Sequence, residues 1–150
     1  MKMIINAEGH VLGRLCSFVA KKALLGEEVL VVNAEKAIIS GNKDMILREE
    51  LEKLTIKNLG NPRRGPFHQK RPDKFVRRSI RGMLPWKKPR GREAFKRVMV
   101  YIGLPEEEIM RKHNIDVKKT KINDLSEMKK DARVRGVAVG EVCRFIGGKF

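Results

Sequence analysis

Two glycines near the N-terminus lie where a phosphate-binding loop would be placed. The segment Gly9-His10-Val11-Leu12-Gly13-Arg14 stands between an apolar run and an amphipathic stretch. A phosphate loop has four residues between its glycines and ends in Lys followed by Ser or Thr. Here three residues separate the glycines and Arg14-Leu15 follow, and the dinucleotide pattern fails as well. We therefore expect a tight turn that leaves Arg14 at a helix start, where it can contact a phosphate of a partner molecule.

No other residues form a catalytic or metal-binding pattern. His10, His68 and His113 are far apart in the sequence, and no Ser-His-Asp arrangement or pair of catalytic carboxylates can be picked out. Cys16 and Cys143 are the only cysteines, and both lie among apolar residues, as the reduced thiols of a protein core do. Two cysteines without a matching histidine cluster do not make a zinc site. We therefore expect no enzymatic activity, no metal and no cofactor.

The charge of the chain is concentrated in one segment. The protein has 150 residues and a net charge of +16, and residues 61–97 alone hold 14 basic and 2 acidic residues. Five of the six prolines lie there too, whereas the flanking regions have the balance of an ordinary globular domain. A chain with this excess charge needs a polyanion, which is either nucleic acid or an anionic membrane surface.

The membrane is the weaker of these two alternatives. No run of 18 apolar residues exists to span a bilayer. The N-terminus, Met1-Lys2-Met3-Ile4-Ile5, leads directly into a strand-like run and lacks the apolar core and cleavage site of a signal peptide. We therefore expect a cytoplasmic protein that binds nucleic acid, with no membrane and no small-molecule substrate.

The segment Arg63-Arg64-Gly65-Pro66-Phe67-His68-Gln69-Lys70-Arg71-Pro72 has the residue types of an RNA-binding loop. Arginine forks bind phosphates in a bidentate manner. Phe67 and His68 offer flat surfaces to unpaired bases, and glycine and proline fix an extended loop that can enter a groove. The alternative is a disordered basic linker, but a linker would not usually resume with an amphipathic helix that carries arginines on one face.

That helix is predicted to run from Asp73, as its cap, to about Leu84, with one apolar and one basic face. The apolar face holds Val76, Ile80 and Met83, and the basic face holds Arg77, Arg78 and Arg81. Trp86, in the loop that follows, either stacks on a base or packs beneath the loop. The candidate RNA-binding residues are Arg14, Arg63, Arg64, Phe67, His68, Lys70, Arg71, Lys74, Arg77, Arg78, Arg81, Trp86, Lys87, Lys88, Arg90 and Arg92.

Alternating strands and helices would position this segment. Apolar runs predict strands at 3–7, 29–33 and 98–102 and a last strand at 132–139, and residues 37–40 extend or follow the second strand. Amphipathic spacing predicts a helix from Leu12 to Gly26 and a short one around 142–146. This order indicates an α/β fold with helices on both faces of the sheet.

The remaining segments are predicted in less detail. A helix capped by Asn42 or Asp44 would turn the leucines at 47, 51 and 54 inward and pair Glu49 with Lys53 on its outer face. Residues 85–90 read as a loop and 93–97 as a short helical turn. Residues 104–131 are polar, and their pattern does not fix a conformation.

One stretch of the sequence is specific enough to indicate a family. Ile80-Arg81-Gly82-Met83-Leu84-Pro85 is followed after five residues by Gly91-Arg92 and after five more by Val98-Met99-Val100-Tyr101-Ile102-Gly103. This pattern resembles the signature of large-subunit ribosomal protein thirteen, a universal ribosomal family. Gly13-Arg14-Leu15, Val31-Val32-Asn33-Ala34-Glu35-Lys36 and Lys70-Arg71-Pro72-Asp73 agree with it, and Pro85-Trp86-Lys87-Lys88 is similar to its archaeal and eukaryotic branch.

The resemblance implies a three-layer α/β/α domain with a small, mostly parallel four-stranded sheet, helices on both faces and a basic loop–helix insertion. It also implies a single domain over residues 1–150 that binds large-subunit ribosomal RNA through 61–97, takes an early part in subunit assembly and has ribosomal protein three as a neighbour. The alternatives are a free RNA-binding protein that regulates translation of messenger RNA, and an RNA-modifying enzyme, which would need a catalytic cluster.

Overall fold

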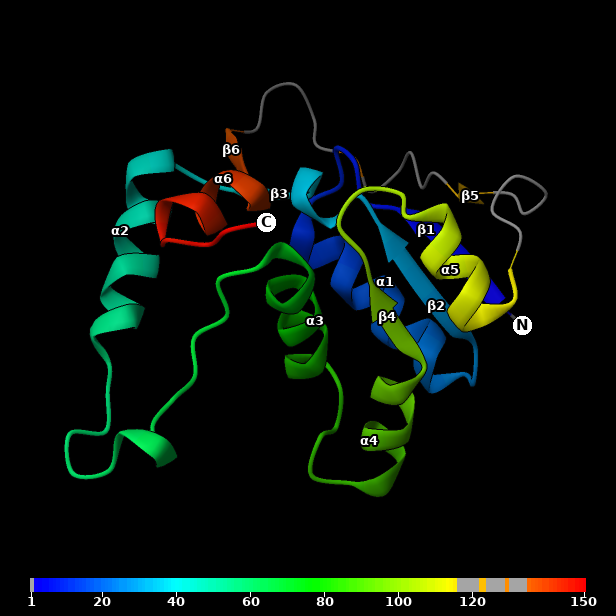
Figure 1. The fold of residues 1–150 in the computed structure, drawn as a ribbon, viewed down its shortest axis with the longest axis horizontal. Coiled ribbons are helices and arrows are strands. Elements are labelled where there is room, and N and C mark those ends of the chain that lie inside the picture. The colour runs from blue at the N-terminus through cyan, green and yellow to red at the C-terminus, as the bar shows by residue number, and fades with distance from the viewer. Residues whose placement is uncertain (1, 116–121, 124–128, 130–134) are drawn as a thin grey trace.

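The centre of the molecule is a parallel sheet of four strands. The computed structural model describes residues 2–115, 122, 123, 129 and 135–150. The strands are β1 (Lys2–Asn6), β2 (Glu28–Val32), β4 (Val98–Val100) and β5 (Ile122–Asn123), in the order β4-β2-β1-β5 (Figure 1). Ile5 of β1 is in register with Val31 of β2, which is in register with Val100 of β4. The expected α/β fold with a four-stranded sheet is confirmed.

The inner residues of the strands are apolar because both faces of the sheet are covered. On one face, Ile5, Val31 and Val98 belong to a core that also includes α1 (Leu12–Leu24), α3 (Pro72–Gly82) and α4 (Pro89–Lys96). On the other face, Ile4 and Leu30 pack with Ile109 of α5 (Glu106–His113). Helix, sheet and helix therefore form the three layers. Helix α5 lies in a segment whose pattern predicted no element.

The last predicted strand belongs to a second, smaller sheet rather than to the central one. Strand β3 (Ile38–Ser40) pairs antiparallel with β6 (Gly136–Ala138), and the fourth strand of the main sheet is β5. Of the range predicted for the last strand, residues 132–134 lie outside the described residues. Beside β3 and β6 lie α2 (Lys43–Thr55) and α6 (Val139–Phe145), at the side of the molecule away from α5 (Figure 1). Two one-turn helices, η1 (Ala34–Lys36) and η2 (Pro62–Arg64), complete the described elements.

Several local predictions are corrected. In α2, capped by Asn42 as expected, Ile46 is the buried residue and Leu51 is 43% exposed, because α2 packs mainly on α6 and the small sheet rather than on the central sheet. On the outer face, Lys53 pairs with Glu50, and not with Glu49.

Three predictions about α3 and α4 are also wrong. Helix α3 begins at Pro72 with Arg71 at the N-cap position, so that Asp73 lies inside the first turn instead of capping it. Met83, expected on the apolar face of α3, follows its last residue and is 43% exposed. Helix α4 starts at Pro89, within the stretch that was read as loop, because proline suits the first position of a helix.

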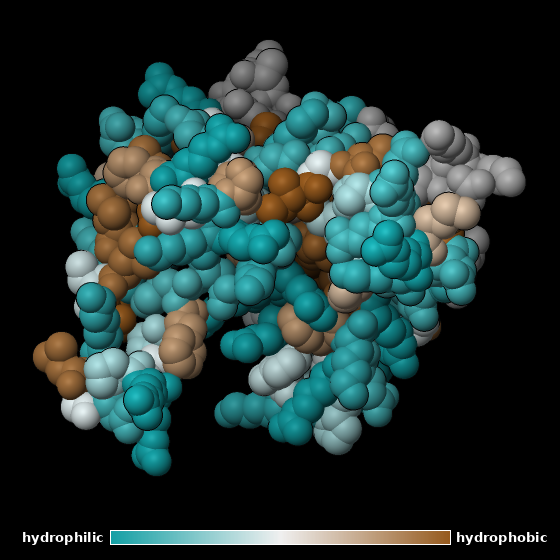
Figure 2. Space-filling view, in the orientation of Figure 1, coloured by the Kyte–Doolittle hydropathy of each residue, from teal (hydrophilic) through white to brown (hydrophobic). Residues whose placement is uncertain are grey.

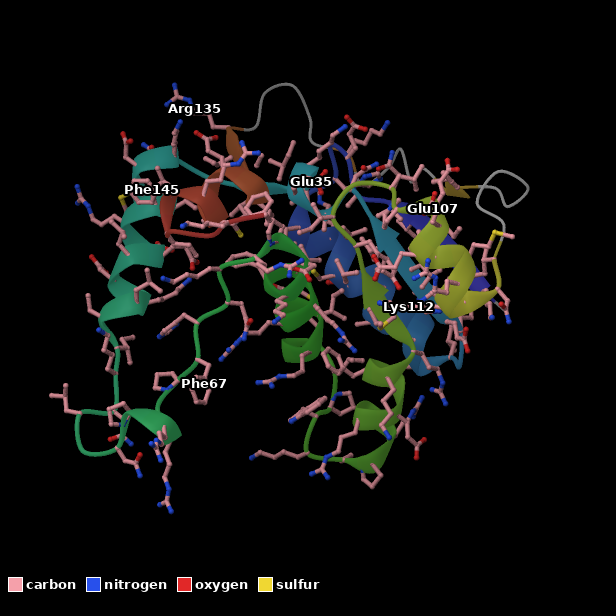
Figure 3. The ribbon with its side chains drawn as sticks, viewed as in Figure 1. Glu35, Phe67, Glu107, Lys112, Arg135 and Phe145 are labelled. Atoms are coloured by element: carbon pink, nitrogen blue, oxygen red, sulfur yellow. The ribbon has the colours of Figure 1, made fainter. Side chains whose placement is uncertain are left out.

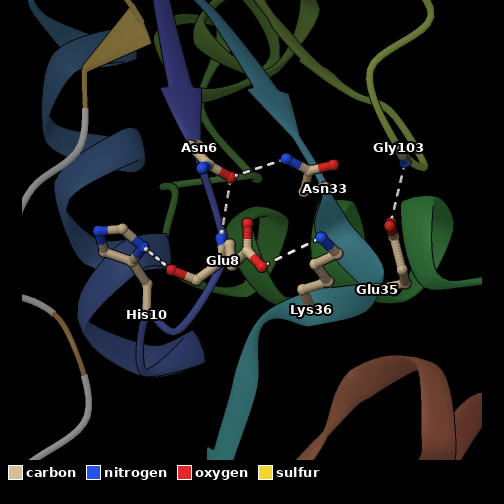
Figure 4. A network of polar contacts seen from close by, with 7 residues as sticks. All are labelled: Asn6, Glu8, His10, Asn33, Glu35, Lys36 and Gly103. Carbon is tan, nitrogen blue, oxygen red and sulfur yellow. Dashed lines mark hydrogen bonds and ion pairs between the residues drawn. The ribbon is translucent and has the colours of Figure 1, made fainter.

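Side chains at the carboxyl ends of β1, β2 and β4 hold these strand ends together (Figure 4). The Asn33 amide donates to Asn6 Oδ1 over 2.9 Å, and Glu35 Oε2 accepts from the backbone N–H of Gly103 over 3.0 Å. Asn33 has a φ of 55°, a left-handed conformation that asparagine tolerates better than most residues. These contacts connect segments that are far apart in the sequence.

Candidate nucleic-acid interface

Helix α3 is the centre of the basic surface. Pro72 occupies its first turn, and Val76 and Ile80 are fully buried against the sheet side of the core. Residues that follow Val76 and Ile80 by one or two places lie on the opposite face of the helix. Arginines occupy three of these positions. The predicted division of the helix into an apolar and a basic face is therefore confirmed for Val76 and Ile80.

The connection from α3 to α4 is held by a close backbone contact at Gly91. A Cβ atom at this position would lie 2.2 Å from the carbonyl oxygen of Pro85 and 3.1 Å from the nitrogen of Trp86. Only glycine allows α4 to approach the preceding loop this closely. The glycine of the Gly91-Arg92 pair thus has a packing role, and it fixes the position of the aromatic side chains around it.

Two arginines of α3 lie over aromatic rings instead of beside carboxylates. The guanidinium carbon of Arg77 lies 4.6 Å from the ring centroid of Phe95, and that of Arg81 lies 5.0 Å from the centroid of Trp86. The two rings meet edge to face, with centroids 5.2 Å apart. Cation–π contact orients a guanidinium without neutralising it, so both charges remain available to a partner.

The third arginine reaches in the other direction, to the chain that precedes α3. Arg78 Nη1 donates a hydrogen bond to the carbonyl oxygen of Phe67. Phe67 lies on the arm, residues 56–71, which leaves α2, passes through η2 and returns to α3 (Figures 1 and 3). The Phe67 ring is 63% exposed. Arg78 thereby connects the arm to the helix and leaves an aromatic ring on the surface between them.

A groove opens between the arm, α3 and α4. Figure 2 shows the surface hollowed at this place, with hydrophilic residues along its rim. The cavity has a volume of about 340 Å³. Its lining combines one amide, one aromatic ring and four cations: Gln69, Phe95, Lys74, Arg77, Arg78 and Arg81. Carboxylates are absent from this lining, so these cations face the groove without a counter-charge from its walls.

Comparison with known proteins identifies the family. The profile of the family described as ribosomal protein L13 matches residues 1–107. The chain belongs to the ribosomal protein L13 family. It is 45% identical to the large ribosomal subunit protein uL13 of Methanococcus maripaludis over 149 residues, which cover 99% of each chain. It is 52% identical to the protein of the same name from Methanocaldococcus jannaschii, over 85% of this chain and 94% of the relative.

Membership of the L13 family bears on two predictions. It confirms the family that the Ile80–Gly103 pattern indicated, and the relatives are archaeal, as the similarity to that branch suggested. It also supports the prediction that the chain is not an enzyme, since the family is one of ribosomal proteins. Within the described residues, no three His, Cys, Asp or Glu side chains come close enough to hold a metal ion.

Other predicted site residues of this L13-family chain lie outside the groove. Arg63 and Arg64 are exposed in η2 at the far end of the arm, where Asn61 caps the turn by accepting from the Arg63 N–H. His68 is half-buried, and its Nε2 lies 3.2 Å from the carbonyl oxygen of Ile56. His68 therefore contacts the residue that follows α2, whereas the Phe67 side chain is exposed.

The basic residues that flank the groove have distinct surroundings. Arg71 forms an ion pair with Asp73 over 3.3 Å, and Arg92 Nε donates to the Trp86 carbonyl over 3.3 Å. The backbone of Lys70 lies close to the C-terminal tail, where a Cβ on Gly148 would meet its carbonyl oxygen at 2.1 Å. Exposed basic side chains without a groove contact are Arg14, Lys87, Lys88 and Arg90.

Trp86 is predicted either to stack on a base or to pack beneath the loop, and in the structure it packs against neighbouring side chains while part of it stays exposed. The side chain is 38% exposed, with Phe95 at its edge and Arg81 over its face. The sequence pattern does not select Phe95 or Gln69, because both border the groove only through contacts between segments that are far apart in the sequence.

The glycine-containing turn after β1 does not have the surroundings of a phosphate-binding loop. Gly9 adopts a φ of 74°, and the nearby Glu8 carboxylate forms an ion pair with Lys36 over 3.0 Å (Figure 4). His10 is fully buried, with Nδ1 3.0 Å from the Glu8 carbonyl oxygen. A carboxylate at this turn disfavours an anionic ligand, and Arg14 projects from the next helical turn as an exposed side chain.

The cysteines behave as core residues. Cys16 and Cys143 are free and buried, and burial raises the pKa of each thiol to about 12. Both thiols are therefore protonated at neutral pH and are poor nucleophiles and metal ligands. None of the helices in the described part of the chain has the length and apolarity that a membrane span requires.

Proposed function

We propose that this chain is a structural constituent of the large ribosomal subunit and binds large-subunit ribosomal RNA. The observation that carries the proposal is the groove, which gathers four cations without a carboxylate in a member of the L13 family. The relatives are named large ribosomal subunit protein uL13, which assigns them to that particle. In archaea the particle is cytoplasmic, and this chain would be located there.

The mechanism is charge neutralisation combined with shape. Guanidinium groups bind phosphate oxygens through two parallel N–H bonds, and each contact releases a counterion. Arg77, Arg78 and Arg81 would hold one RNA strand along α3, while the arm and the loop before α4 would hold strands on either side. The proposed contacts are Arg14, Arg63, Arg64, Phe67, His68, Lys70, Arg71, Lys74, Trp86, Lys87, Lys88, Arg90 and Arg92 together with the three arginines of α3.

A protein that clamps separate strands would act early in subunit assembly, when those strands are first brought together. We also propose that residues 1–150 form one domain, with segment 61–97 as its RNA-binding part, and that ribosomal protein three is a neighbour in the particle. The last point is supported by the family resemblance. Sedimentation of cell lysate tests the particle, because the protein should migrate with the large subunit in moderate salt.

A salt series tests the RNA contact directly. If about half of the 14 basic residues of 61–97 reach phosphates, the logarithm of affinity should fall against the logarithm of salt concentration with a slope of about −4 to −7. The probe is a large-subunit ribosomal RNA fragment, with random duplex RNA of equal length as the control. A slope near −1, or equal affinity for both RNAs at every salt concentration, would contradict the proposal.

A further inference from the structure

The geometry points to a pocket for one unpaired nucleotide in the groove between the arm, α3 and α4. This inference rests on the proposed RNA binding and specifies it further: the groove would take a base turned out of the RNA stack, with its phosphate. Arg77 would stack on the base, and Gln69 would bind its edge. Neither a duplex backbone nor an acidic peptide would use the flat surfaces of this groove.

The first step of the argument is the Arg77–Phe95 stack. The guanidinium lies 4.6 Å from the ring centroid, so one of its faces is covered by Phe95, while both residues border the groove. Arg77 Nε is buried and has no hydrogen-bond partner within the described residues, which shows that the group is partly removed from water. A held guanidinium presents a flat cationic surface, and unpaired bases stack on such surfaces as well as on aromatic rings.

The second step is the presence of an amide beside that surface. Gln69 borders the groove and is half-buried. An amide carries both donors and an acceptor, so it can match the edge of a base, whereas a phosphate offers acceptors only. A site for phosphate alone would have no use for the acceptor of Gln69.

The third step is the position of the remaining cations. Lys74 and Arg78 lie on α3 at the arm side of the groove, and Arg78 is oriented by its hydrogen bond to the Phe67 carbonyl oxygen. They would bind the phosphates on either side of the base. With a volume of about 340 Å³, the cavity suits a single nucleotide and is too small for a helical RNA segment.

The experiment compares two RNA hairpins of the same charge that differ at one bulged position. One has a single bulged adenosine, and the other has an abasic residue at the bulge. The full-length protein should bind the adenosine hairpin about 5- to 150-fold more tightly, the range expected for stacking of one base. A 2-aminopurine in the bulge should change its fluorescence on binding, because its stacking partner changes.

Two variants locate the effect. Gln69→Ala and Phe95→Leu should each reduce the preference for the bulged base while changing the affinity for the abasic hairpin by less than about threefold. Phe95 packs against the core, so Gln69→Ala is the variant that tests the pocket if Phe95→Leu unfolds the protein. The matched control is Lys88→Ala, outside the groove, which should weaken both hairpins equally and retain the preference.

The outcomes separate this inference from the proposed function. If neither hairpin nor ribosomal RNA binds, the proposed function itself is wrong. If both hairpins bind with equal affinity, RNA binding stands and the nucleotide pocket is overturned. Displacement of both hairpins from the wild-type groove by a polyglutamate peptide at equal charge concentration would also overturn it, because the groove would then be an anion site without base recognition.

Discussion

The positive charges of α3 and α4 are held in a different way from those around the sheet. Near the sheet, lysines meet carboxylates: Lys36 lies 3.0 Å from Glu8, and Lys22 lies 3.1 Å from Glu27. In segment 61–97, Arg71–Asp73 is the one ion pair formed within the described residues. Four arginines of this segment contact aromatic rings or backbone carbonyls instead: Arg77, Arg78, Arg81 and Arg92.

This difference separates charges that serve the fold from charges kept for a partner. An ion pair uses a cation inside the molecule and contributes little stability at the surface. A ring or a carbonyl fixes the direction of a guanidinium but leaves its full charge. Net charge alone would not distinguish the two groups, whereas their partners do.

The largest expected effect is the loss of RNA binding on replacing the arginines of α3. Arg77→Ala, Arg78→Ala and Arg81→Ala together should reduce affinity for large-subunit RNA about 100-fold or more at 0.15 M salt and lower the magnitude of the salt slope by about 2 to 3, because each removed phosphate contact lowers it by about 1. The fold should persist. Circular dichroism and filter binding measure the two properties.

The matched control removes three positive charges from lysines that form ion pairs with carboxylates. Lys22→Ala, Lys36→Ala and Lys112→Ala together leave their partners Glu27, Glu8 and Glu108 free. We expect RNA affinity to stay within about fivefold of wild type. If this variant loses as much affinity as the arginine variant, only the total charge matters, and the comparison between the two groups fails.

The central elements were predictable because their patterns are strong. The inner residues of β1, β2 and β4 form continuous apolar runs, and α1 has an unbroken apolar face, so the burial of these residues determines both kinds of element. Helix α5 was missed because Ile109 is its single buried residue. Strand β6 was recognised as a strand but placed in the wrong sheet, since alternation along a strand does not specify which partner it pairs with.

The candidate site was predictable as a segment but not as a pocket. Charge density and prolines selected residues 61–97, and the helical period gave the basic face of α3. Phe95 and Gln69 were missed because they acquire their roles only when the arm and α4 approach α3. Such contacts depend on tertiary packing, including the backbone approach at Gly91, which no local pattern encodes.

The next largest effect concerns Gly91, whose close backbone contact lies beside the aromatic rings that Arg77 and Arg81 contact. Gly91→Ala should destabilise the protein by about 2–4 kcal/mol, because its Cβ would meet the Pro85 carbonyl at 2.2 Å and the backbone must move. The control is Gly82→Ala, where a Cβ has no neighbour within 4 Å. Urea unfolding should show the control within about 0.5 kcal/mol of wild type or slightly more stable. Equal midpoints for the two variants would mean that the close approach is not required.

A smaller effect should follow from removing one carboxylate charge, either in the basic segment or near the sheet. Asp73→Asn releases Arg71 in the basic segment, and Glu8→Gln releases Lys36 near the sheet. We expect the first to raise RNA affinity about 2- to 5-fold, as one additional phosphate contact would, and the second to change it by less than about twofold. Because Asp73 lies in the first turn of α3, its loss should cost stability of about 0.3–1 kcal/mol. Equal gains from both variants would argue for long-range attraction alone.

The smallest effect is a pH dependence confined to the side of the sheet away from α3. Tyr101 Oη and His113 Nε2 lie 2.8 Å apart, and partial burial lowers the pKa of His113 below its usual value of 6.5, against the opposing pull of Glu28. The unfolded chain therefore takes up this proton first as the pH falls below about 6.5, so His113 makes the folded state less stable in acid. His113→Gln keeps a hydrogen-bonding group for Tyr101 but cannot be protonated, and it should lose less stability than wild type between pH 7 and pH 5 in urea melts.

RNA affinity at pH 7 should be the same for both proteins, because α5 and α3 cover opposite faces of the sheet. A greater acid sensitivity in the variant would reverse the sign and contradict the assignment, and a loss of RNA affinity would show that the two sides are not independent.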